Sequence, residues 1–440
     1  MIRKLLREVK YERRHKAGMM TAALLALSAC AYPYTPPALS PVTRPAPSAP
    51  PLATAVPAGP ATILVSIDGF RPDYLRQGNT PNLDALAAAG VEAPMRPSFP
   101  TLTFPNHYTL VTGLRPDRHG VVDNTMEDPR RPGVQFKISD PKQTGDRFWW
   151  DEAEPVWVAA ERAGLRTGVM FWPGSDAAIG GVRPSIWMPY TAYITSPERV
   201  RFVLDWLRRP AAERPAFETL YFDVVDKTSH NQGYDSPEKF AAIREVDTAI
   251  GQLRAGLAAL NTPANLVIVA DHGMEAVPPG HELAPADVFA DASIARVVVG
   301  GPALQIYPAA GQDTTVAAQL LRPHLHAHCW RKEAIPARLH YGHNPRVAPF
   351  YCLADSGWRF TTEPPLTFAK GDHGFDNADP AMRALFIAFG PAFAPGRHLS
   401  EFDNVDVYPL LRQLIGLPPL AGLDGDAARF RTVMRPERGR

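Results

Sequence analysis

The chain has 440 residues, of which 45% are apolar, and this is enough to bury the core of one large domain or two smaller ones. Its 46 basic and 45 acidic residues nearly cancel, so charge gives no reason to expect a stable complex with nucleic acid or binding to a charged membrane surface. Three cysteines are too few for a disulfide scaffold.

The first 30 residues have the pattern of an export signal. Residues 1–16 are rich in Arg and Lys, and the apolar run from Met19 to Leu27 is far shorter than the roughly 18 residues of a membrane-spanning helix. The run is followed by Ser28-Ala29-Cys30, which resembles a bacterial lipobox, where the cysteine is lipidated. We therefore expect a lipoprotein signal peptide over 1–30 and a periplasmic or outer-membrane-anchored protein of a Gram-negative bacterium. Its only membrane contact would be a lipid at Cys30; the alternative is plain secretion with cleavage nearby.

Residues 31–60 differ in composition from the rest of the chain. Ten of the 47 prolines lie between Pro33 and Pro60, and the segment has no acidic residue and one basic residue, Arg44. Such a segment cannot bury enough apolar surface to order itself. It is predicted to be a semi-extended, disordered tether.

After residue 60, continuous apolar runs typical of buried parallel strands alternate with segments of helical period. The strand-like runs are 62–67, 167–171, 219–225, 266–270 and 384–389, and the clearest helix is 238–260. This alternation predicts an α/β fold with a mostly parallel central sheet and helices on both faces. We expect the domain over 61–420, with a small inserted cap at about 276–360 and a C-terminal tail at 421–440. In the cap, Cys329 and Cys352 are expected to form a disulfide in an oxidising compartment.

Polar side chains that could bind a metal stand where strand-like runs end or in the loop before the last one. In such a sheet, functional residues lie just beyond the carboxyl ends of the strands. The candidates are Asp68, Asp226, His230, Asp271, His272 and His373. Each alone has an ordinary explanation as a helix cap or turn, but together they supply ligands suited to zinc. With the oxygen of Thr103 they would fill two sites of three to four ligands.

Thr103 stands just before Phe104-Pro105, and Pro105 is suited to be the first residue of a helix. A hydroxyl there would lie at the positive end of the helix dipole, where an anion binds. Two metals about 4 Å apart can stabilise both oxygens of an in-line phosphoryl displacement and lower the pKa of such a hydroxyl. The residues therefore predict phosphoryl transfer with Thr103 as the nucleophile.

These motifs, in this order, resemble the nucleotide pyrophosphatase/phosphodiesterase (type I phosphodiesterase) family of the alkaline phosphatase superfamily, over about residues 61–417. The segments that carry the resemblance are Ser66-Ile67-Asp68-Gly69-Phe70, Thr103-Phe104-Pro105-Asn106-His107, Thr112-Gly113-Leu114, His119-Gly120, Asp123-Asn124, Phe171-Trp172-Pro173-Gly174-Ser175, Ala270-Asp271-His272-Gly273-Met274 and Gly371-Asp372-His373-Gly374.

The resemblance implies an alkaline phosphatase-like fold and two zinc ions. One ion would be bound by Asp226, His230 and His373, and the other by Asp68, Asp271, His272 and the Thr103 oxygen. It also implies that Thr103 becomes covalently nucleotidylated, while Asn124 binds a non-bridging phosphate oxygen.

The same resemblance places Trp172 and Tyr190 opposite Phe104, so that a nucleobase could stack between aromatic faces. For any one aromatic the alternative is a core residue. The expected function is a zinc hydrolase that cleaves nucleotide phosphodiester and pyrophosphate bonds through a phosphothreonine intermediate and releases nucleoside 5′-monophosphates. The alternatives are a phosphodiesterase acting on phospholipid headgroups and a non-catalytic nucleotide-binding lipoprotein. The oligomeric state is not predicted.

Overall fold

The computed structural model describes residues 59–291 and 293–436. The predicted signal peptide of 1–30, with Cys30, and the predicted tether up to residue 58 lie outside the described residues. Among the helices that are described, none has the length and apolar character needed to cross a membrane.

A nine-stranded sheet forms the centre of the fold, in the order β18-β2-β17-β8-β1-β7-β5-β6, with β19 also paired to β2. Its strands are β1 (Ala61–Ile67), β2 (Val91–Arg96), β5 (Thr167–Met170), β6 (Ile186–Trp187), β7 (Phe217–Phe222), β8 (Ala264–Val269), β17 (Ala384–Phe389), β18 (Arg397–His398) and β19 (Phe402–Asp403). All residues of β1 are buried, and β1 pairs in parallel with β7 and β8. Only β17 is antiparallel to its neighbours, β8 and β2. The mostly parallel sheet predicted from the apolar runs is confirmed.

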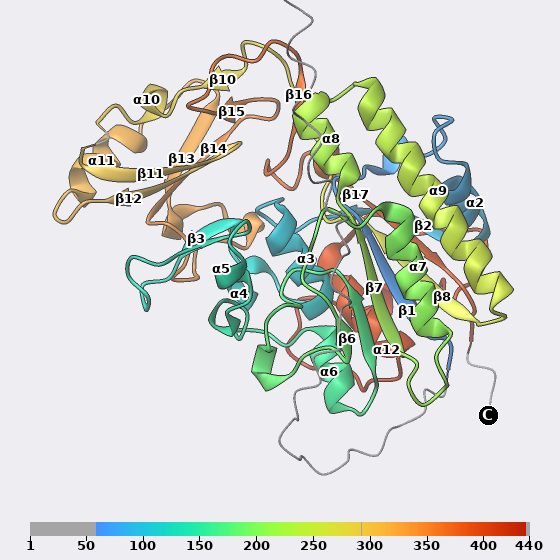
Figure 1. Cartoon of the computed structure of the whole chain (residues 1–440). Helices are drawn as coiled ribbons and strands as arrows, with labels where there is room; N and C mark the ends of the chain where they lie inside the picture. The colour runs from blue at the N-terminus through green and yellow to red at the C-terminus, as the bar shows by residue number, and fades with distance from the viewer. Residues whose placement is uncertain (1–58, 292, 437–440) are drawn as a thin grey trace, which may run out of the picture. The chain divides into compact units, whose positions relative to one another are not determined.

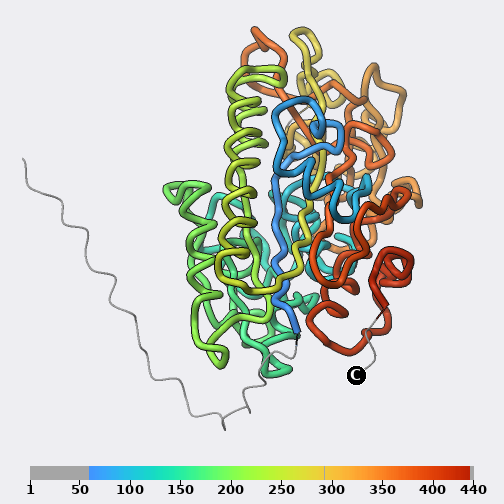
Figure 2. Tube along the Cα trace, turned by 90° about the vertical axis from the view of Figure 1, so that its right-hand side faces the viewer, coloured from blue at the N-terminus to red at the C-terminus, as the bar shows by residue number. Residues whose placement is uncertain are grey.

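Helices cover both faces of this sheet (Figures 1 and 2). On one side, α2 (Pro81–Ala89), α7 (Ser196–Leu207) and α8 (Val224–Gln232) pack against the long α9 (Pro237–Ala259). On the other, α4 (Pro116–His119) and α12 (Val407–Leu414) pack against α3 (Thr103–Thr112), and α12 also contacts α6 (Val156–Arg162). The short α5 (Pro141–Thr144) follows the hairpin of β3 (Thr125–Glu127) and β4 (Gln135–Lys137). The α/β class is therefore as predicted.

The strand predicted over 219–225 ends earlier than expected. β7 stops at Phe222, which is paired with Ile67, the last residue of β1. With no further strand beside it, the chain turns into α8, where the amide of Lys227 donates to the carbonyl of Asp223. Val224 and Val225 favour a strand by propensity, but helix geometry satisfies their backbone groups where no ladder partner is available. Asp226 and His230 consequently lie on a helix, one turn apart.

An insertion, in the region predicted as a cap, has its own sheet, ordered β11-β12-β14-β13 (Figure 1). The elements of this part of the chain are β9 (Glu275–Val277), β10 (Glu282–Leu283), α10 (Pro285–Val288), β11 (Ala295–Gly300), β12 (Ala303–Pro308), α11 (Asp313–Leu320), β13 (Ala327–Arg331), β14 (Phe350–Ala354), β15 (Arg359–Phe360) and β16 (Lys370–Asp372). Some residues of this sheet, such as Leu304 and Phe350, belong to a hydrophobic cluster of the insertion, whereas Ala303, Tyr351 and Leu353 belong to the main core. Cys329 and Cys352 are opposite each other in β13 and β14 and are joined by a disulfide, as predicted.

A buried arginine of the insertion binds residues of the segment 120–149. Arg346 is fully buried and donates to Asp128 Oδ2 (2.7 Å) and to the carbonyls of Gly120 (2.7 Å) and Trp149 (2.9 Å). A buried charge of this kind is stabilised only when it is paired and its donors are satisfied. The insertion therefore helps to fix the segment around 120–149, which contains Asn124.

The predicted C-terminal tail packs onto the sheet over its described part. Phe430, in the 3₁₀ turn η8 (Ala427–Phe430), is fully buried and lies edge to face with Phe402 of β19, their centroids 5.2 Å apart. The amide of Ala394 donates to the carbonyl of Val433. The folded domain thus extends past residue 420, because Phe430 covers apolar surface that would otherwise face water.

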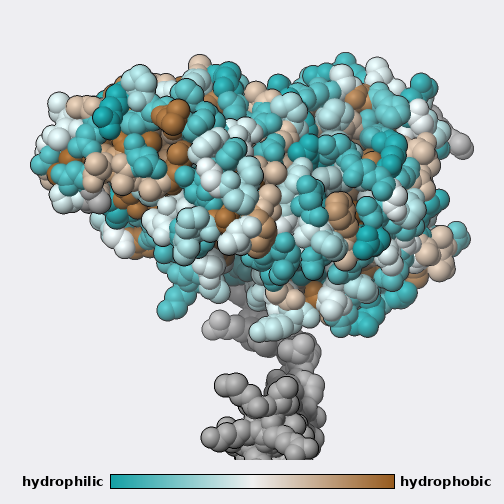
Figure 3. Space-filling model, turned by 90° about the horizontal axis from the view of Figure 1, so that it is seen from above, coloured by the Kyte–Doolittle hydropathy of each residue, from teal (hydrophilic) through white to brown (hydrophobic). Residues whose placement is uncertain are grey.

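Hydrophilic residues dominate the face shown in Figure 3, with apolar residues scattered between them. Large apolar side chains that remain exposed in the described chain include Ile138 and Tyr190. Both of these line one cavity. That cavity is next to the predicted catalytic residues.

Candidate active site

The predicted metal ligands come together at the carboxyl ends of the central strands. Asp68 follows β1, and Asp271 and His272 follow β8, the parallel neighbour of β1. Asp226 and His230 lie on α8, just after β7 on the other side of β1. His373 follows β16. Strands that are adjacent and parallel end at the same edge of the sheet, and this explains why residues so far apart in sequence meet.

Thr103 is the first residue of α3, two residues earlier than the start predicted at Pro105. The helix begins with the amide of Asn106 donating to the carbonyl of Leu102 (3.1 Å). Pro105 is accommodated in the first turn because its missing N–H would have no partner within the helix there. The Thr103 hydroxyl therefore stands at the positive end of the helix, as expected, with Oγ1 3.3 Å from His272 Nε2.

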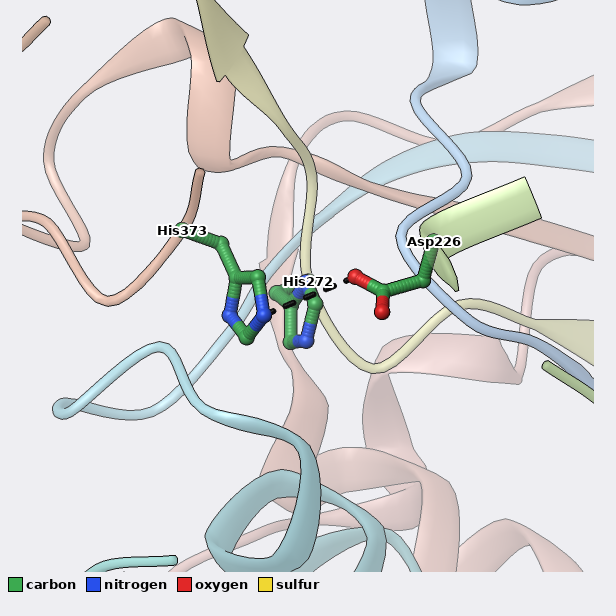
Figure 4. Close-up of side chains that lie close together, drawn as sticks. All are labelled: Asp226, His272 and His373. Carbon is green, nitrogen blue, oxygen red and sulfur yellow. Dashed lines mark ion pairs between the residues drawn. The ribbon is translucent and has the colours of Figure 1, made fainter. Parts of the chain in front are cut away.

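Two of the predicted ligands, His230 and His373, converge on one oxygen of a third, Asp226. His230 Nε2 lies 3.3 Å and His373 Nε2 3.5 Å from Asp226 Oδ1. In Figure 4, the carboxylate of Asp226 and the ring of His373 point toward one another. These separations are near the ligand-to-ligand distance around a tetrahedral zinc with bonds of about 2.0 Å.

A second set converges on His272. Its Nε2 lies 3.0 Å from Asp271 Oδ2 and 3.4 Å from Asp68 Oδ1, in addition to the contact with Thr103. The two sets touch, because the rings of His272 and His373 stack with centroids 3.6 Å apart. By distance alone His272 also groups with Asp226 and His373, so the geometry brings the ligands together without assigning His272 to one ion.

The donor set fits cations. Asp68 Oδ1, Asp226 Oδ1 and Asp271 Oδ2 are buried, and among the described residues their near polar neighbours include the histidine nitrogens given above, none of which is aligned for a regular hydrogen bond. Burial, and then repulsion by Asp271 and Asp226, raises the pKa of Asp68 well above its usual range. Burial of three such carboxylates is costly unless positive charge compensates them. Burial lowers the pKa of His373 to about 3, with further lowering by His272. Against the effect of burial, Asp226 raises the pKa of His230 to about 9 and Asp271 raises that of His272, so these two rings pair with carboxylates.

Asn124 lies beside the start of α3. Its side-chain oxygen accepts a hydrogen bond from the backbone N–H of Phe104, at 3.0 Å. Since Phe104 provides a donor, the oxygen of the amide must face it, and the amide nitrogen is left on the opposite side. The Asn124 side chain is therefore bound to the residue that follows Thr103, and its amide nitrogen remains as a donor on the side away from that bond.

An aromatic cavity of about 470 Å³ opens beside these groups. Thr103, Asp68 and Asp226 line part of it. Its aromatic residues are Phe104, Phe171, Trp172, Tyr190 and Tyr221. The three predicted aromatics, Phe104, Trp172 and Tyr190, therefore line one cavity. Two of them differ in exposure, because Tyr190 is 48% exposed and Trp172 only 3%. Trp172 also donates its indole N–H to the carbonyl of His107 (2.9 Å). None of the lining residues comes from the insertion, so the predicted cap does not form a wall of this cavity.

Comparison with known proteins agrees with this geometry. The family model described as type I phosphodiesterase / nucleotide pyrophosphatase matches residues 62–376, more than half of the chain. The chain belongs to this family. The resemblance noted from the sequence motifs is confirmed, and the family's members among the relatives carry the names of enzymes.

Among these pyrophosphatase/phosphodiesterase relatives, an uncharacterized protein of Schizosaccharomyces pombe is 38% identical over 81% of this chain and 77% of its own length. Ectonucleotide pyrophosphatase/phosphodiesterase family member 1 of Rattus norvegicus is 36% identical over 86% of this chain, which spans only 43% of that protein. Among solved structures, murine family member 5, as an inactive threonine-to-alanine variant in complex with AMP, superposes with a TM-score of 0.81 at 32% identity, covering 86% of this chain and all of that one.

Two residues of the candidate active site of this chain were not predicted from the sequence. His107 Nδ1 lies 3.3 Å from Asp271 Oδ2 and 2.8 Å from the carbonyl of Thr103, and Tyr221 donates to Asp68 Oδ2 at 2.6 Å. His107 could have been found, because it follows Thr103 by one helical turn on the same face. Nothing in the sequence near Tyr221, on β7, marks it as a partner of Asp68, on a different strand end.

Proposed function

We propose that this phosphodiesterase family member cleaves phosphodiester and pyrophosphate bonds of nucleotides and releases nucleoside 5′-monophosphates through a covalent intermediate on Thr103. The observation that carries the proposal is the position of Thr103 Oγ1. It lies at the N-terminus of α3, 3.3 Å from His272 Nε2. Thr103 also lines the aromatic cavity, together with Asp68 and Asp226 of the carboxylate cluster.

Two zinc ions are the cofactors that fit the donor set. Asp226, His230 and His373 would hold one ion, and Asp68, Asp271, His272 and Thr103 the other. Bound there, zinc would act as a Lewis acid on the phosphoryl oxygens and lower the pKa of a coordinated hydroxyl. The three buried carboxylate oxygens, which accept no regular hydrogen bond among the described residues, support this assignment.

The chain's own groups then carry out a double displacement. The Thr103 hydroxyl loses its proton to solvent, and its Oγ attacks phosphorus as the bond from phosphorus to the leaving oxygen breaks, which gives a nucleotidyl-threonine. Asn124 donates from its amide nitrogen to a non-bridging oxygen, on which charge develops, and the dipole of α3 favours the same charge. Water then attacks phosphorus from the side the leaving group vacated, and the bond to Thr103 Oγ breaks. A proton released by the water restores the Thr103 hydroxyl, and the nucleoside monophosphate is released.

The aromatic cavity supports a nucleotide over other phosphodiesters. A base can stack on aromatic faces whatever its identity, which adds on the order of 1 to 3 kcal/mol per base. Phe104 follows the nucleophile directly, and Tyr190 exposes nearly half of its surface at the same cavity. The AMP bound by murine family member 5 and the name bis(5'-adenosyl)-triphosphatase of a Xenopus laevis relative point the same way.

The test compares hydrolysis of p-nitrophenyl thymidine 5′-monophosphate and bis-p-nitrophenyl phosphate by the zinc-loaded protein and two variants. We expect a higher kcat/KM for the nucleotide ester, near-complete loss with Thr103→Ala, and substantial activity with Thr103→Ser, which keeps a hydroxyl. Equal turnover of both esters would refute a base-binding cavity, and a rate retained by Thr103→Ala would refute the covalent step. Preference for a phosphocholine lipid over both esters would favour the headgroup phosphodiesterase. A folded protein that takes up almost no zinc and hydrolyses none of these substrates would favour the non-catalytic alternative.

We also propose that the enzyme is exported and held at a membrane by lipidation of Cys30. The Leu27-Ser28-Ala29-Cys30 sequence after a short apolar run supports this. Metabolic labelling with palmitate should mark the wild-type protein and not Cys30→Ser. Equal labelling of the two would exclude Cys30 as the anchor.

A further inference from the structure

Tyr190 belongs to the loop between β6 and α7, yet its side chain is held in place. Its hydroxyl donates to Asp223 Oδ2 at 2.7 Å. Its ring meets that of Phe171 edge to face, with centroids 5.3 Å apart. Tyr190 is 48% exposed, and without these two contacts so exposed an aromatic side chain on a loop would be free to change rotamer.

The acceptor of this bond is itself fixed by a buried cation. Asp223 Oδ1 accepts from Arg199, at 2.8 Å, while Oδ2 accepts from Tyr190. Arg199, on α7, is 3% exposed and also donates to the carbonyls of Tyr221 (2.8 Å) and Ile194 (3.0 Å). A guanidinium with this many donors satisfied in a fixed geometry holds the carboxylate more rigidly than a flexible ammonium could.

The same arginine lies near the aromatic wall. Its guanidinium carbon is 5.3 Å from the centroid of Phe171 and 5.9 Å from that of Tyr190, distances at which a cation attracts the ring electrons. Asp223 also precedes α8, three residues before Asp226. One short segment therefore connects the wall of the cavity with the predicted metal ligands.

We propose that Asp223 and Arg199 are positioning residues that hold the ring of Tyr190 as a preorganised stacking surface for the nucleobase. This inference rests on the proposed function, because it concerns the base cavity of that reaction. Neither residue needs to touch phosphate. A ring that is already ordered loses less conformational freedom when a base stacks on it, so the pair acts on nucleotide binding and not on the chemical step.

The decisive variant is Tyr190→Phe, which keeps the ring and removes only the bond to Asp223. We expect KM for p-nitrophenyl thymidine 5′-monophosphate to rise about two- to tenfold, the range of one hydrogen bond, with little change in kcat. KM for methyl p-nitrophenyl phosphate, whose only aromatic ring is the leaving group, should stay close to the wild-type value, because this substrate has no base to stack on Tyr190. Tyr193→Phe is the matched control, since Tyr193 lies on the same loop and is 94% exposed; it should alter neither KM.

Two further variants separate the possible failures. Asp223→Ala should raise KM for the nucleotide ester similarly, and combining it with Tyr190→Phe should add little, because both remove the same bond. Tyr190→Ala should raise KM more than Tyr190→Phe. If Tyr190→Ala raises KM but Tyr190→Phe does not, the positioning role is overturned while base stacking stands. If Tyr190→Ala leaves KM unchanged, base stacking on Tyr190 fails as well. An equal rise in KM for methyl p-nitrophenyl phosphate in Tyr190→Phe would place the effect at the reacting centre and also overturn the proposal.

Discussion

The side chain of Asn124 offers a sharp test of how the substrate phosphate is bound. Its oxygen is committed to the N–H of Phe104, at 3.0 Å, so its nitrogen is the group available to a phosphate next to Thr103. Asn124→Asp keeps the shape of the side chain and the acceptor for Phe104. It replaces the donor with a second negatively charged oxygen.

The expected loss follows from two contributions. A carboxylate about 4 Å from an anionic phosphoryl oxygen is repelled by about 4 kcal/mol at an effective dielectric constant near 20. The lost hydrogen bond to a charged group costs about 1.5 to 3 kcal/mol more. Since about 1.4 kcal/mol corresponds to a factor of ten in rate, the two contributions together should lower kcat/KM by about ten-thousandfold or more. Asn124→Ala removes only the donor, so a smaller loss of about 10- to 150-fold is expected.

The assay is the initial rate of bis-p-nitrophenyl phosphate hydrolysis, with zinc content and thermal unfolding measured for each variant. This substrate has no base, so nucleobase binding does not contribute, and any stacking of its nitrophenyl rings is common to all three proteins. The order of activities should be wild type, then Asn124→Ala, then Asn124→Asp. If the Asp variant is at least as active as the Ala variant at equal zinc content, the assignment of Asn124 to the phosphate is wrong.

Two further predictions concern stability. Replacing Cys329 and Cys352 by Ala should lower the free energy of unfolding by about 3 kcal/mol, the chain-entropy value for a sequence separation of 23, and identical guanidinium midpoints for the variant and wild type would contradict this. Burial lowers the pKa of His119 to about 3, and its Nδ1 accepts from the amide of Val121, so the neutral ring is required in the folded protein. Because the folded pKa lies below the unfolded value of about 6.5, the stability that depends on a neutral His119 is complete above pH 6.5 and is lost as the pH falls toward 3. Between pH 6 and 4 the free energy of unfolding of the wild type should therefore fall by up to about 1.4 kcal/mol per pH unit more than that of His119→Gln. Parallel plots of unfolding free energy against pH for the two proteins would count against a buried neutral His119.

Much of the fold could be predicted because its signals are local. The apolar run 62–67 is a buried strand, and the helix predicted over 238–260 forms over Pro237–Ala259. The errors occurred where a local signal was outweighed by the surroundings. Val224 and Val225 favour a strand, but the sheet offers no partner beyond Phe222. The described part of 421–440, which has few apolar residues, is fixed by the burial of Phe430.

The sequence by itself determined which residues could carry the chemistry, because Asp68, Asp271 and His272 directly follow strands whose ends must meet at one edge of the sheet. Only the tertiary structure decided which atoms meet across long separations in the chain. Tyr190 binds Asp223, and Tyr221 binds Asp68, through contacts that depend on side-chain direction and on the distance between neighbouring strands and loops. Hydrogen bonds act over about 3 Å, whereas a sequence pattern fixes the face and the order of an element but not the position of a side-chain atom on that scale.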